Sequence, residues 1–197
     1  PIEGLKEKLK EGLTKKLPGE AAHRLMAPTV RGDNLTPPTN PPPPTKSATL
    51  VLLYKDDTGQ IKFPLIQRPT YNGAHSAQVS LPGGKSEPTD IDLVHTALRE
   101  AQEEIGIDPD KVEVLGKLSN IFIWVSNFIV TPIVGFYHEK PVFQKEDKEV
   151  DAIIETELYD IINLEKRKEG TVLARGKYNI QTRISILMTG LCGGQRP

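Results

Sequence analysis

The sequence of 197 residues contains a single cysteine, Cys192, so no disulfide bond can form within the chain. A chain without disulfide bonds is typical of a reducing compartment, and we expect a cytoplasmic location. The sequence also lacks any run of 18 apolar residues and any signal-peptide pattern, so we expect no membrane partner. Its net charge of −1 gives no basic surface for a nucleic acid and no acidic surface that would repel a phosphorylated substrate.

A cluster of prolines, at positions 37, 38 and 41–44, divides the chain. No helix or central strand forms there, because proline lacks a backbone N–H donor. We therefore predict a Pro-rich connector at residues 29–46, between an N-terminal helical extension at residues 1–28 and a main domain at residues 47–180. Residues 181–197 form an atypical C-terminal tail.

The N-terminal extension begins with an amphipathic segment. Ile2, Leu5, Leu9 and Leu13 recur at helical spacing with lysines between them, which predicts a helix over residues 2–16. Its apolar stripe is narrow and aliphatic, so packing on the chain's own domain or across a dimer is favoured over membrane binding. We expect a turn and a short helix ending at Pro28 to follow.

The main domain alternates strand and helix patterns. Apolar runs predict strands at Ala48–Tyr54 and Ile61–Gln67, joined as a hairpin by the turn at residues 56–59. Further strands are predicted at Val112–Leu118 and Asn127–Tyr137, and a helix at residues 150–164. Strands interleaved with helices are typical of a layered α/β domain.

The strongest helix pattern lies in the middle of the chain. Apolar residues repeat there at steps of three and four, with Asp90 suited to cap the helix and Gly106 to end it. The apolar stripe consists of Ile91, Val94, Leu98, Ala101 and Ile105. At about 100° per residue, Glu100, Glu103 and Glu104 fall in one arc nearly opposite this stripe.

Three carboxylates on one helix face repel one another. The simplest interpretation is a solvated charged face. A hard divalent cation offers another, because Mg²⁺ and Mn²⁺ accept a few carboxylates together with water and substrate phosphate. Gly83 and Gly84, upstream of the helix, would let the backbone approach the cation and the phosphates without a Cβ clash.

The spacing decides between these interpretations. The segment Arg99-Glu100-x-x-Glu103-Glu104-x-Gly106-Ile107, after Pro82-Gly83-Gly84, resembles the Nudix box of pyrophosphohydrolases. It departs from the usual box by one inserted residue and by Asp90 in place of Glu. With both departures, the segment resembles the branch of the family that hydrolyses coenzyme A. The resemblance implies an α/β fold, the Nudix fold, with an α/β/α sandwich around a mixed β-sheet.

The resemblance also implies a cation site. Glu100 and Glu104, one helical turn apart, would ligate Mg²⁺ or Mn²⁺, with Gly83 close to the ion. Glu103 is expected at a second ion and in catalysis. Arg99 would orient the glutamates by ion pairing, or contact phosphate directly.

Hydrolysis of a phosphoric anhydride also needs a positioned water and a base, because the anionic oxygens repel a nucleophile. In the family this base is often an acidic residue on a loop after the central strands. The loop sequence KEDKEVDAI makes Glu149 the first candidate. Glu146 and Asp151 remain alternatives.

The segment before the box is informative about substrate specificity. Relatives that cleave coenzyme A carry two arginines here; Arg68 fits the first, whereas Gly73 stands at the second. Ala77 and Leu81 also replace the Gly and Phe of that signature. The resemblance implies a substrate-binding set that consists of Arg68, His75, Gln78, Gly84 and Lys85. Arg68 taken alone could equally be a surface residue at a strand end.

The expected enzyme is therefore a Nudix pyrophosphohydrolase acting on a small nucleotide-type substrate, with a homodimer as one possible assembly. The resemblance implies that it hydrolyses coenzyme A or a derivative to 3′,5′-ADP and 4′-phosphopantetheine. The alternatives are another nucleoside diphosphate derivative, such as ADP-ribose or a dinucleotide, or a catalytically silent module that binds a nucleotide or partner. The tail at residues 181–197 differs from the family's usual ending, and we hypothesise that a frameshift altered it.

Overall fold

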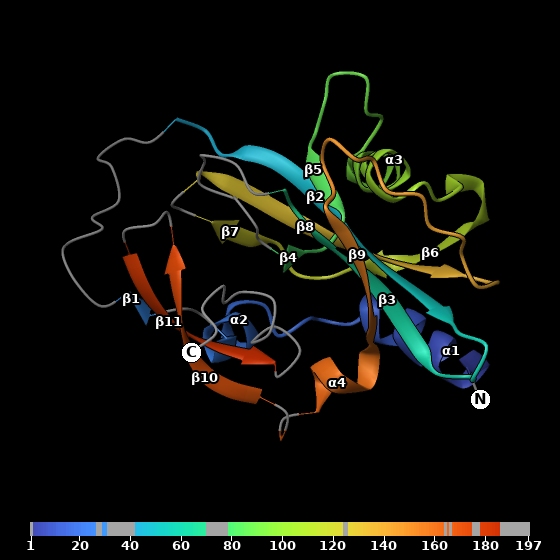
Figure 1. Cartoon of the computed structure of the whole chain (residues 1–197), viewed down its shortest axis with the longest axis horizontal. Coiled ribbons are helices and arrows are strands. Elements are labelled where there is room, and N and C mark those ends of the chain that lie inside the picture. The colour runs from blue at the N-terminus through green and yellow to red at the C-terminus, as the bar shows by residue number, and fades with distance from the viewer. Residues whose placement is uncertain are drawn as a thin grey trace.

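The computed structural model describes residues 2–26, 29–30, 42–69, 79–123, 126–163, 165, 167–174 and 178–185. Its largest element is a mixed sheet of eight strands (Figure 1). None of the helices within these ranges is long and apolar enough to cross a membrane.

A parallel strand pair forms the centre of this sheet. Strand β2 (Thr45–Lys55) pairs along its length with β8 (Phe128–Tyr137), and both are strongly apolar, as expected for strands covered on both faces. The main strand order is β4-β3-β2-β8-β6, with β5, β7 and β9 paired onto it. These strands are β3 (Ile61–Gln67), β4 (Val79–Ser80), β5 (Gly83–Lys85), β6 (Val112–Lys117), β7 (Ile121–Ile123) and β9 (Ala152–Glu157).

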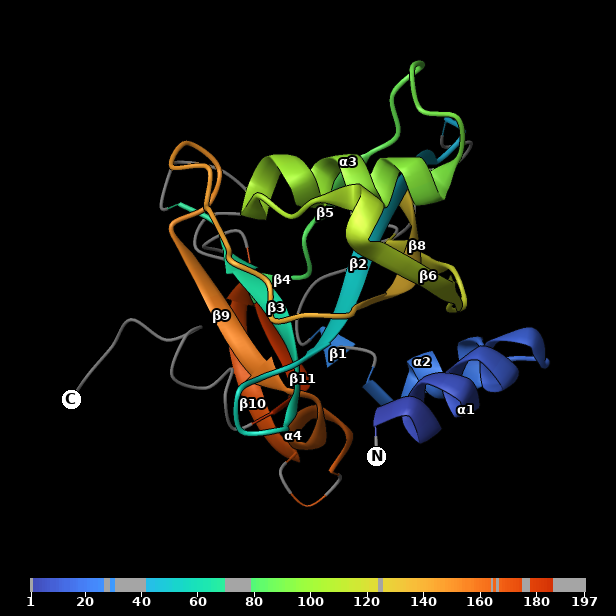
Figure 2. The ribbon, with the colours of Figure 1, turned by 90° about the vertical axis from the view of Figure 1, so that its right-hand side faces the viewer.

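Helices cover both faces of the sheet (Figure 2). Helix α3 (Leu93–Ile105) packs on one face, over Leu50 and Leu52 of β2. Helices α1 (Ile2–Thr14) and α4 (Leu158–Ile162) pack on the other, over Val51 and Leu53. The alternation along β2 follows from the two-residue period of a strand. The predicted α/β/α sandwich with a mixed β-sheet is therefore confirmed.

The N-terminal helix is held by apolar and charged contacts. Leu9 and Leu13 pack against the core on the α1 side of the sheet. Lys6 and Lys10 both form ion pairs with Glu113 of β6, with a Lys6 Nζ to Glu113 Oε2 distance of 3.1 Å. The predicted amphipathic helix thus packs on its own domain. A short helix, α2 (Glu20–Met26), follows it as expected.

One secondary-structure prediction is wrong, whereas the predicted hairpin and the strands predicted at Val112–Leu118 and Asn127–Tyr137 are confirmed. Residues 152–162 form β9 and the short α4 instead of a single helix, because Ile153 and Ile154 pair with Ile66 and Leu65 of β3. β-Branched side chains favour such pairing over a helix. The hairpin of β2 and β3 forms as predicted, with antiparallel pairs at Tyr54–Lys62 and Lys55–Ile61.

A second sheet has three strands in the order β1-β11-β10. They are β1 (Thr29–Val30), β11 (Tyr178–Ser185) and β10 (Arg167–Ala174). The boundary expected between the main domain and the tail, at residue 181, falls inside β11. Residues 31–41 of the expected connector and residues 186–197 of the tail lie outside the described residues.

Candidate active site

Helix α3 carries the carboxylates, but its buried face differs from the expected one. The buried residues of α3 are Thr96, Ala97, Ala101, Glu104 and Ile105. Glu104 is only 1% exposed and faces the sheet, so the prediction that all three glutamates lie opposite the apolar face is wrong for Glu104. Ile91, expected in the apolar stripe, precedes the helix and is 88% exposed.

Glu104 is buried because the backbone of β5 supplies a partner. Its Oε2 accepts a hydrogen bond of 2.7 Å from the Gly83 backbone N–H. Its Oε1 lies 3.5 Å from Nη2 of Arg68, just beyond the end of β3. Burial raises the pKa of Glu104 to about 7, and the negative charges of Glu100 and Glu149 add to the effect. Gly83 and Arg68 act against the rise without cancelling it.

Two glycines, Gly83 and Gly84, let strand β5 lie close to β2 and to helix α3. A Cβ atom on Gly83 would lie 2.3 Å from the carbonyl oxygen of Ala48, and its φ of +150° is also unfavourable for other residues. A Cβ atom on Gly84 would lie 2.5 Å from the carboxylate of Glu100. The Gly-Gly pair is therefore required by close contacts with β2 and with the Glu100 side chain.

Asp90 is buried beside Arg99 and does not cap the helix. The N-cap is Asp92, whose side chain accepts a hydrogen bond from the His95 backbone N–H, so the prediction of Asp90 as the cap is wrong. Asp90 instead pairs with Arg99, with an Nε to Oδ1 distance of 3.0 Å, and accepts hydrogen bonds from Thr96 and the Glu87 backbone N–H. Chiefly through Arg99, these partners hold the pKa of Asp90 well below its usual range.

Arg99 connects Asp90 to two of the glutamates. Its Nη2 lies 2.9 Å from Glu100 Oε1, and its Nη1 lies 3.0 Å from Glu103 Oε2. Nη2 also donates to the backbone carbonyl of Lys85 at 3.1 Å. With its charge shared among three carboxylates, Arg99 positions Glu100 and Glu103. The sequence marked Asp90 as a candidate helix cap and as a departure from the box, and neither feature revealed its burial against Arg99.

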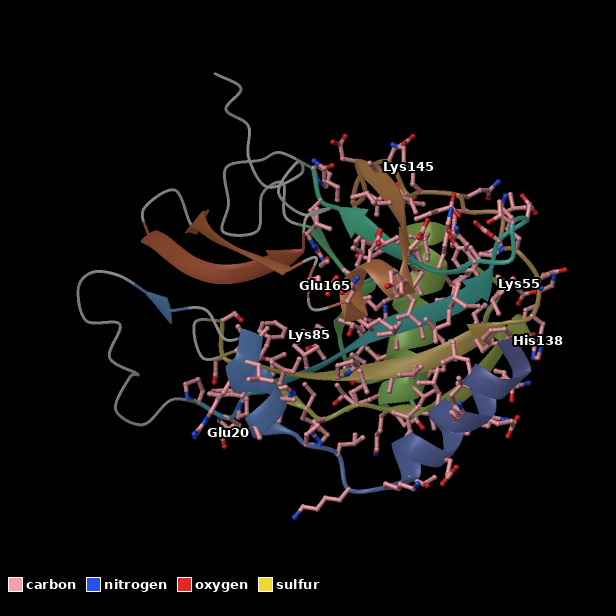
Figure 3. The ribbon with its side chains drawn as sticks, turned by 90° about the horizontal axis from the view of Figure 1, so that it is seen from below. Glu20, Lys55, Lys85, His138, Lys145 and Glu165 are labelled. Atoms are coloured by element: carbon pink, nitrogen blue, oxygen red, sulfur yellow. The ribbon has the colours of Figure 1, made fainter. Side chains whose placement is uncertain are left out.

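The loop that carries Glu149 is anchored next to the glutamates. The backbone N–H groups of Gln144 and Glu146 donate to the carbonyls of Ile105 and Glu104, at 2.9 and 3.1 Å. At the other end of the loop, the Asp151 N–H donates to the carbonyl of Gln67 at 2.8 Å. Figure 3 shows the start of the loop at its labelled Lys145, on the side of the molecule away from α1.

Of the three acidic candidates on this loop, Glu149 has a described electrostatic effect on the helix carboxylates. Its charge raises the pKa of both Glu100 and Glu104, after the larger effect of burial. Glu149 is the acidic residue of this loop among the main causes of the two shifts. Glu149 is also exposed, so its carboxylate is open to water.

The carboxylates fit a hard divalent cation in charge and chemistry. Glu100 and Glu104 are largely buried, one helical turn apart, and both have a raised pKa, so a cation would relieve their repulsion. Within the described part of the chain, no three His, Cys, Asp or Glu side chains already converge on one point. Mg²⁺ and Mn²⁺ do not require this, because water and substrate oxygens complete their coordination.

The predicted substrate-binding residues are placed only in part. Arg68 lies beside Glu104, and Gly84 lies against Glu100. Lys85 follows Gly84 at the end of β5, with an exposed side chain. His75 and Gln78 lie outside the described residues, as do Gly73 and Ala77.

Comparison with known proteins places this arrangement in a family. The model of the NUDIX domain matches residues 44–173. The chain is 36% identical over 127 residues to Nudix hydrolase 15, mitochondrial, of Arabidopsis thaliana, covering 64% of this chain and 44% of that protein. It is 40% identical over 102 residues to the uncharacterized Nudix hydrolase NudL of Yersinia enterocolitica, covering 52% of each. The chain thus spans about half the length of these relatives.

A solved structure shares the fold. A C. elegans Ap4A hydrolase in a binary complex has a TM-score of 0.50 and 23% sequence identity, covering 60% of this chain and 83% of that chain. At this identity the likeness concerns the fold alone. The family match, however, covers more than half of the chain, on the residues that form the mixed sheet and its carboxylate helix, and it establishes that the chain belongs to the Nudix family.

Proposed function

We propose that this protein hydrolyses a pyrophosphate linkage in a nucleoside diphosphate derivative, with Mg²⁺ or Mn²⁺ as the cofactor. One observation carries the proposal: the largely buried Glu104 and Glu100 pack against a Gly-Gly backbone, where burial raises the pKa of both carboxylates and the neighbouring Arg68 and Arg99 do not cancel the rise. A site built in this way is stabilised by a divalent cation. That cation would in turn neutralise the charge of a bound pyrophosphate.

The chain's own residues supply the remaining requirements. Glu100 and Glu104 would hold the cation, with Glu103 and the Gly83 backbone beside them, and Arg99 keeps Glu100 and Glu103 in place. The partly exposed Arg68 guanidinium is available for a phosphate oxygen. Glu149 would accept the proton of the attacking water, because its carboxylate is exposed and acts electrostatically on the glutamates of α3.

For the substrate we propose coenzyme A or a derivative, cleaved to 3′,5′-ADP and 4′-phosphopantetheine. The segment from Arg68 to the Gly-Gly turn supports this choice, because it resembles the coenzyme A branch at Arg68, His75 and Gln78. A second candidate is ADP-ribose or a dinucleotide. It is favoured by Gly73, which stands where that branch has an arginine suited to bind an additional phosphate.

Product analysis tests the function and the substrate together. The purified chain is incubated with coenzyme A, ADP-ribose and Ap4A, each with Mg²⁺, with Mn²⁺ and with EDTA, and products are identified by mass spectrometry. We expect 3′,5′-ADP and 4′-phosphopantetheine from coenzyme A, and no product in EDTA.

The Glu104→Gln variant serves as the control for the cation site. It should lose activity by about 10²-fold or more while its circular dichroism spectrum is retained. Near-normal activity of this variant would contradict the cation assignment. Absence of product from every substrate with both cations would favour a catalytically silent binding module.

A further inference from the structure

The two oxygens of Glu104 have different partners. Oε2 accepts a short hydrogen bond from the Gly83 N–H, which is fixed by the backbone of β5. Oε1 faces Nη2 of Arg68 at 3.5 Å, the long limit of a hydrogen bond. Within the described residues, Arg68 is the cationic side chain paired with this buried carboxylate. The oxygen with the weaker contact is therefore the one that a divalent cation would take.

The Arg68 head group is able to leave this contact. Its side chain is 33% exposed, whereas the Glu104 side chain is 1% exposed. Arg68 also follows the last residue of β3, so no ladder partner fixes its position along that strand. A divalent cation bound at Oε1 would place a charge of +2 next to the Arg68 guanidinium. Because like charges repel, the cation would weaken the contact between Arg68 and Glu104.

We propose that Arg68 and the divalent cation compete for Glu104, and that cation binding releases the Arg68 guanidinium to a phosphate oxygen of the substrate. This inference rests on the proposed function and extends it. Arg68 neutralises Glu104 while the cation is absent. Once the cation has taken Oε1, the nearest anion for the released guanidinium is the pyrophosphate. The cation and the nucleotide therefore bind cooperatively, and Arg68 carries part of that cooperativity.

Replacing Arg68 by a neutral residue distinguishes its competition with the cation from its binding of a substrate phosphate. Arg68→Gln removes the competitor, so the cation alone should bind more tightly. It also removes the released charge, so a nucleoside diphosphate should bind more weakly in the presence of the cation. Arg68→Lys retains a positive charge at the same position and should change both affinities much less. A residue that only binds substrate would weaken nucleotide binding without tightening the cation.

The first experiment is a Mn²⁺ titration of the full chain without nucleotide, with free Mn²⁺ measured by electron paramagnetic resonance. Arg68→Gln should bind Mn²⁺ about fivefold more tightly than the wild type, the size expected for loss of a partly exposed ion pair. Arg68→Met, a second neutral variant that keeps an apolar stem, should do the same. Unchanged or weaker Mn²⁺ binding in both variants would overturn the proposal.

A matched control is available at Arg24. Its guanidinium forms an exposed ion pair with Glu20 of α2, with an Nη2 to Oε1 distance of 2.7 Å. Figure 3 shows Glu20 at the opposite end of the molecule from Lys145 and the loop that carries Glu149. Arg24→Gln makes the same chemical change far from the carboxylates and should leave Mn²⁺ affinity unchanged.

The second experiment measures binding of α,β-methylene-ADP, which cannot be hydrolysed, by calorimetry with and without Mn²⁺. In the wild type, Mn²⁺ should strongly increase the affinity for α,β-methylene-ADP. In Arg68→Gln this increase should be smaller by about fivefold or more. Equal enhancement in the two proteins would contradict the release of Arg68. If the wild type binds no Mn²⁺, both the proposed function and this inference fail. If it binds Mn²⁺ and Arg68→Gln binds no more tightly, only this inference fails.

Discussion

The α-carbon of Gly84 faces the carboxylate of Glu100 so closely that a Cβ atom there would lie 2.5 Å from its carbon and both oxygens. Gly84→Ala must therefore push the Glu100 side chain away from its place beside Arg99. We expect cation-dependent hydrolysis to fall by about 10²-fold, as for other small displacements of positioned groups. Steady-state kinetics with saturating Mn²⁺ measure the loss.

Gly12→Ala provides the matched glycine substitution. Gly12 lies in α1, and a Cβ atom added to it would meet no other atom within 4 Å, so alanine fits there without strain. We expect full activity and a gain in stability of about 0.5–1 kcal/mol from the better helix propensity of alanine. If Gly84→Ala proved as active as Gly12→Ala, the close contact with Glu100 would have no role in the reaction.

Asp90→Asn is expected to destabilise the protein at neutral pH. The Asp90 side chain is fully buried against Arg99, so loss of its charge removes one of the three carboxylates that pair with this largely buried guanidinium, at a cost of about 2 kcal/mol. Because the folded-state pKa of Asp90 is lowered, its contribution is present above the unfolded pKa and is lost as pH falls below about 4. Urea unfolding should show the wild type and the variant converging in acid. A difference that stayed constant down to about pH 2 would argue against this ion pair.

Glu104 should give the opposite pH dependence in cation-free protein. Its pKa rises from 4.5 to about 7 on folding, so the folded state holds a proton that the unfolded state releases. Stability should therefore fall by about 2–3 kcal/mol as pH rises from about 4.5 to 7, and then level off. The measurement is the unfolding free energy in EDTA, taken as the difference between wild type and Glu104→Gln. A pH-independent difference would show that the pKa of Glu104 does not change on folding.

Glu149→Gln should reduce the turnover number by about 10²–10⁴-fold if Glu149 is the base. Glu146→Gln and Asp151→Asn, on the same loop, should leave most of the activity, since Glu149 is the loop residue among the main causes of the raised pKa of Glu100 and Glu104. The pH profile of each variant distinguishes loss of a base from a displaced loop. Greater loss in either of the two neighbours would transfer the role to that residue.

Ser80→Ala tests how a buried hydroxyl without a hydrogen-bond partner in the described part of the chain affects stability. The Ser80 hydroxyl is buried and has no hydrogen-bond partner among the described residues. Removing an unpartnered hydroxyl should leave stability unchanged or raise it by up to about 1 kcal/mol. Thr96→Val, which removes a buried hydroxyl that donates to Asp90, should instead cost about 1 kcal/mol. A loss at Ser80 as large as that at Thr96 would indicate a partner beyond the described residues.

The sequence was most informative where a local pattern repeats. The spacing of apolar residues predicts α1, and the alternation of apolar runs and turn residues predicts the hairpin of β2 and β3. The box spacing brings Glu100, Glu103 and Glu104 onto one helix beside a Gly-Gly strand, which the structure shows. Each of these features depends on contacts between residues close in the chain or on a regular period.

Other features depend on contacts that no local pattern encodes. The burial of Glu104 follows from the Gly83 N–H and from Arg68, which is 36 residues away in the sequence. Residues 152–157 form a strand because β3 offers an edge, although their spacing suits a helix. The position of Asp90 suggests a helix cap, whereas its partner Arg99 lies further along, within α3, and only the fold brings their charges together.

The parallel pairing of β2 with β8 has a consequence for how the protein folds. Thr45 lies opposite Phe128, so the central pair joins segments about 80 residues apart, and such long-range pairing slows folding. The glycines and glutamates of the candidate site on β5 and α3 lie within the loop that this pairing closes. We therefore expect refolding to regain cation binding in a single slow phase, together with the β-sheet circular dichroism signal, and not earlier with the helical signal.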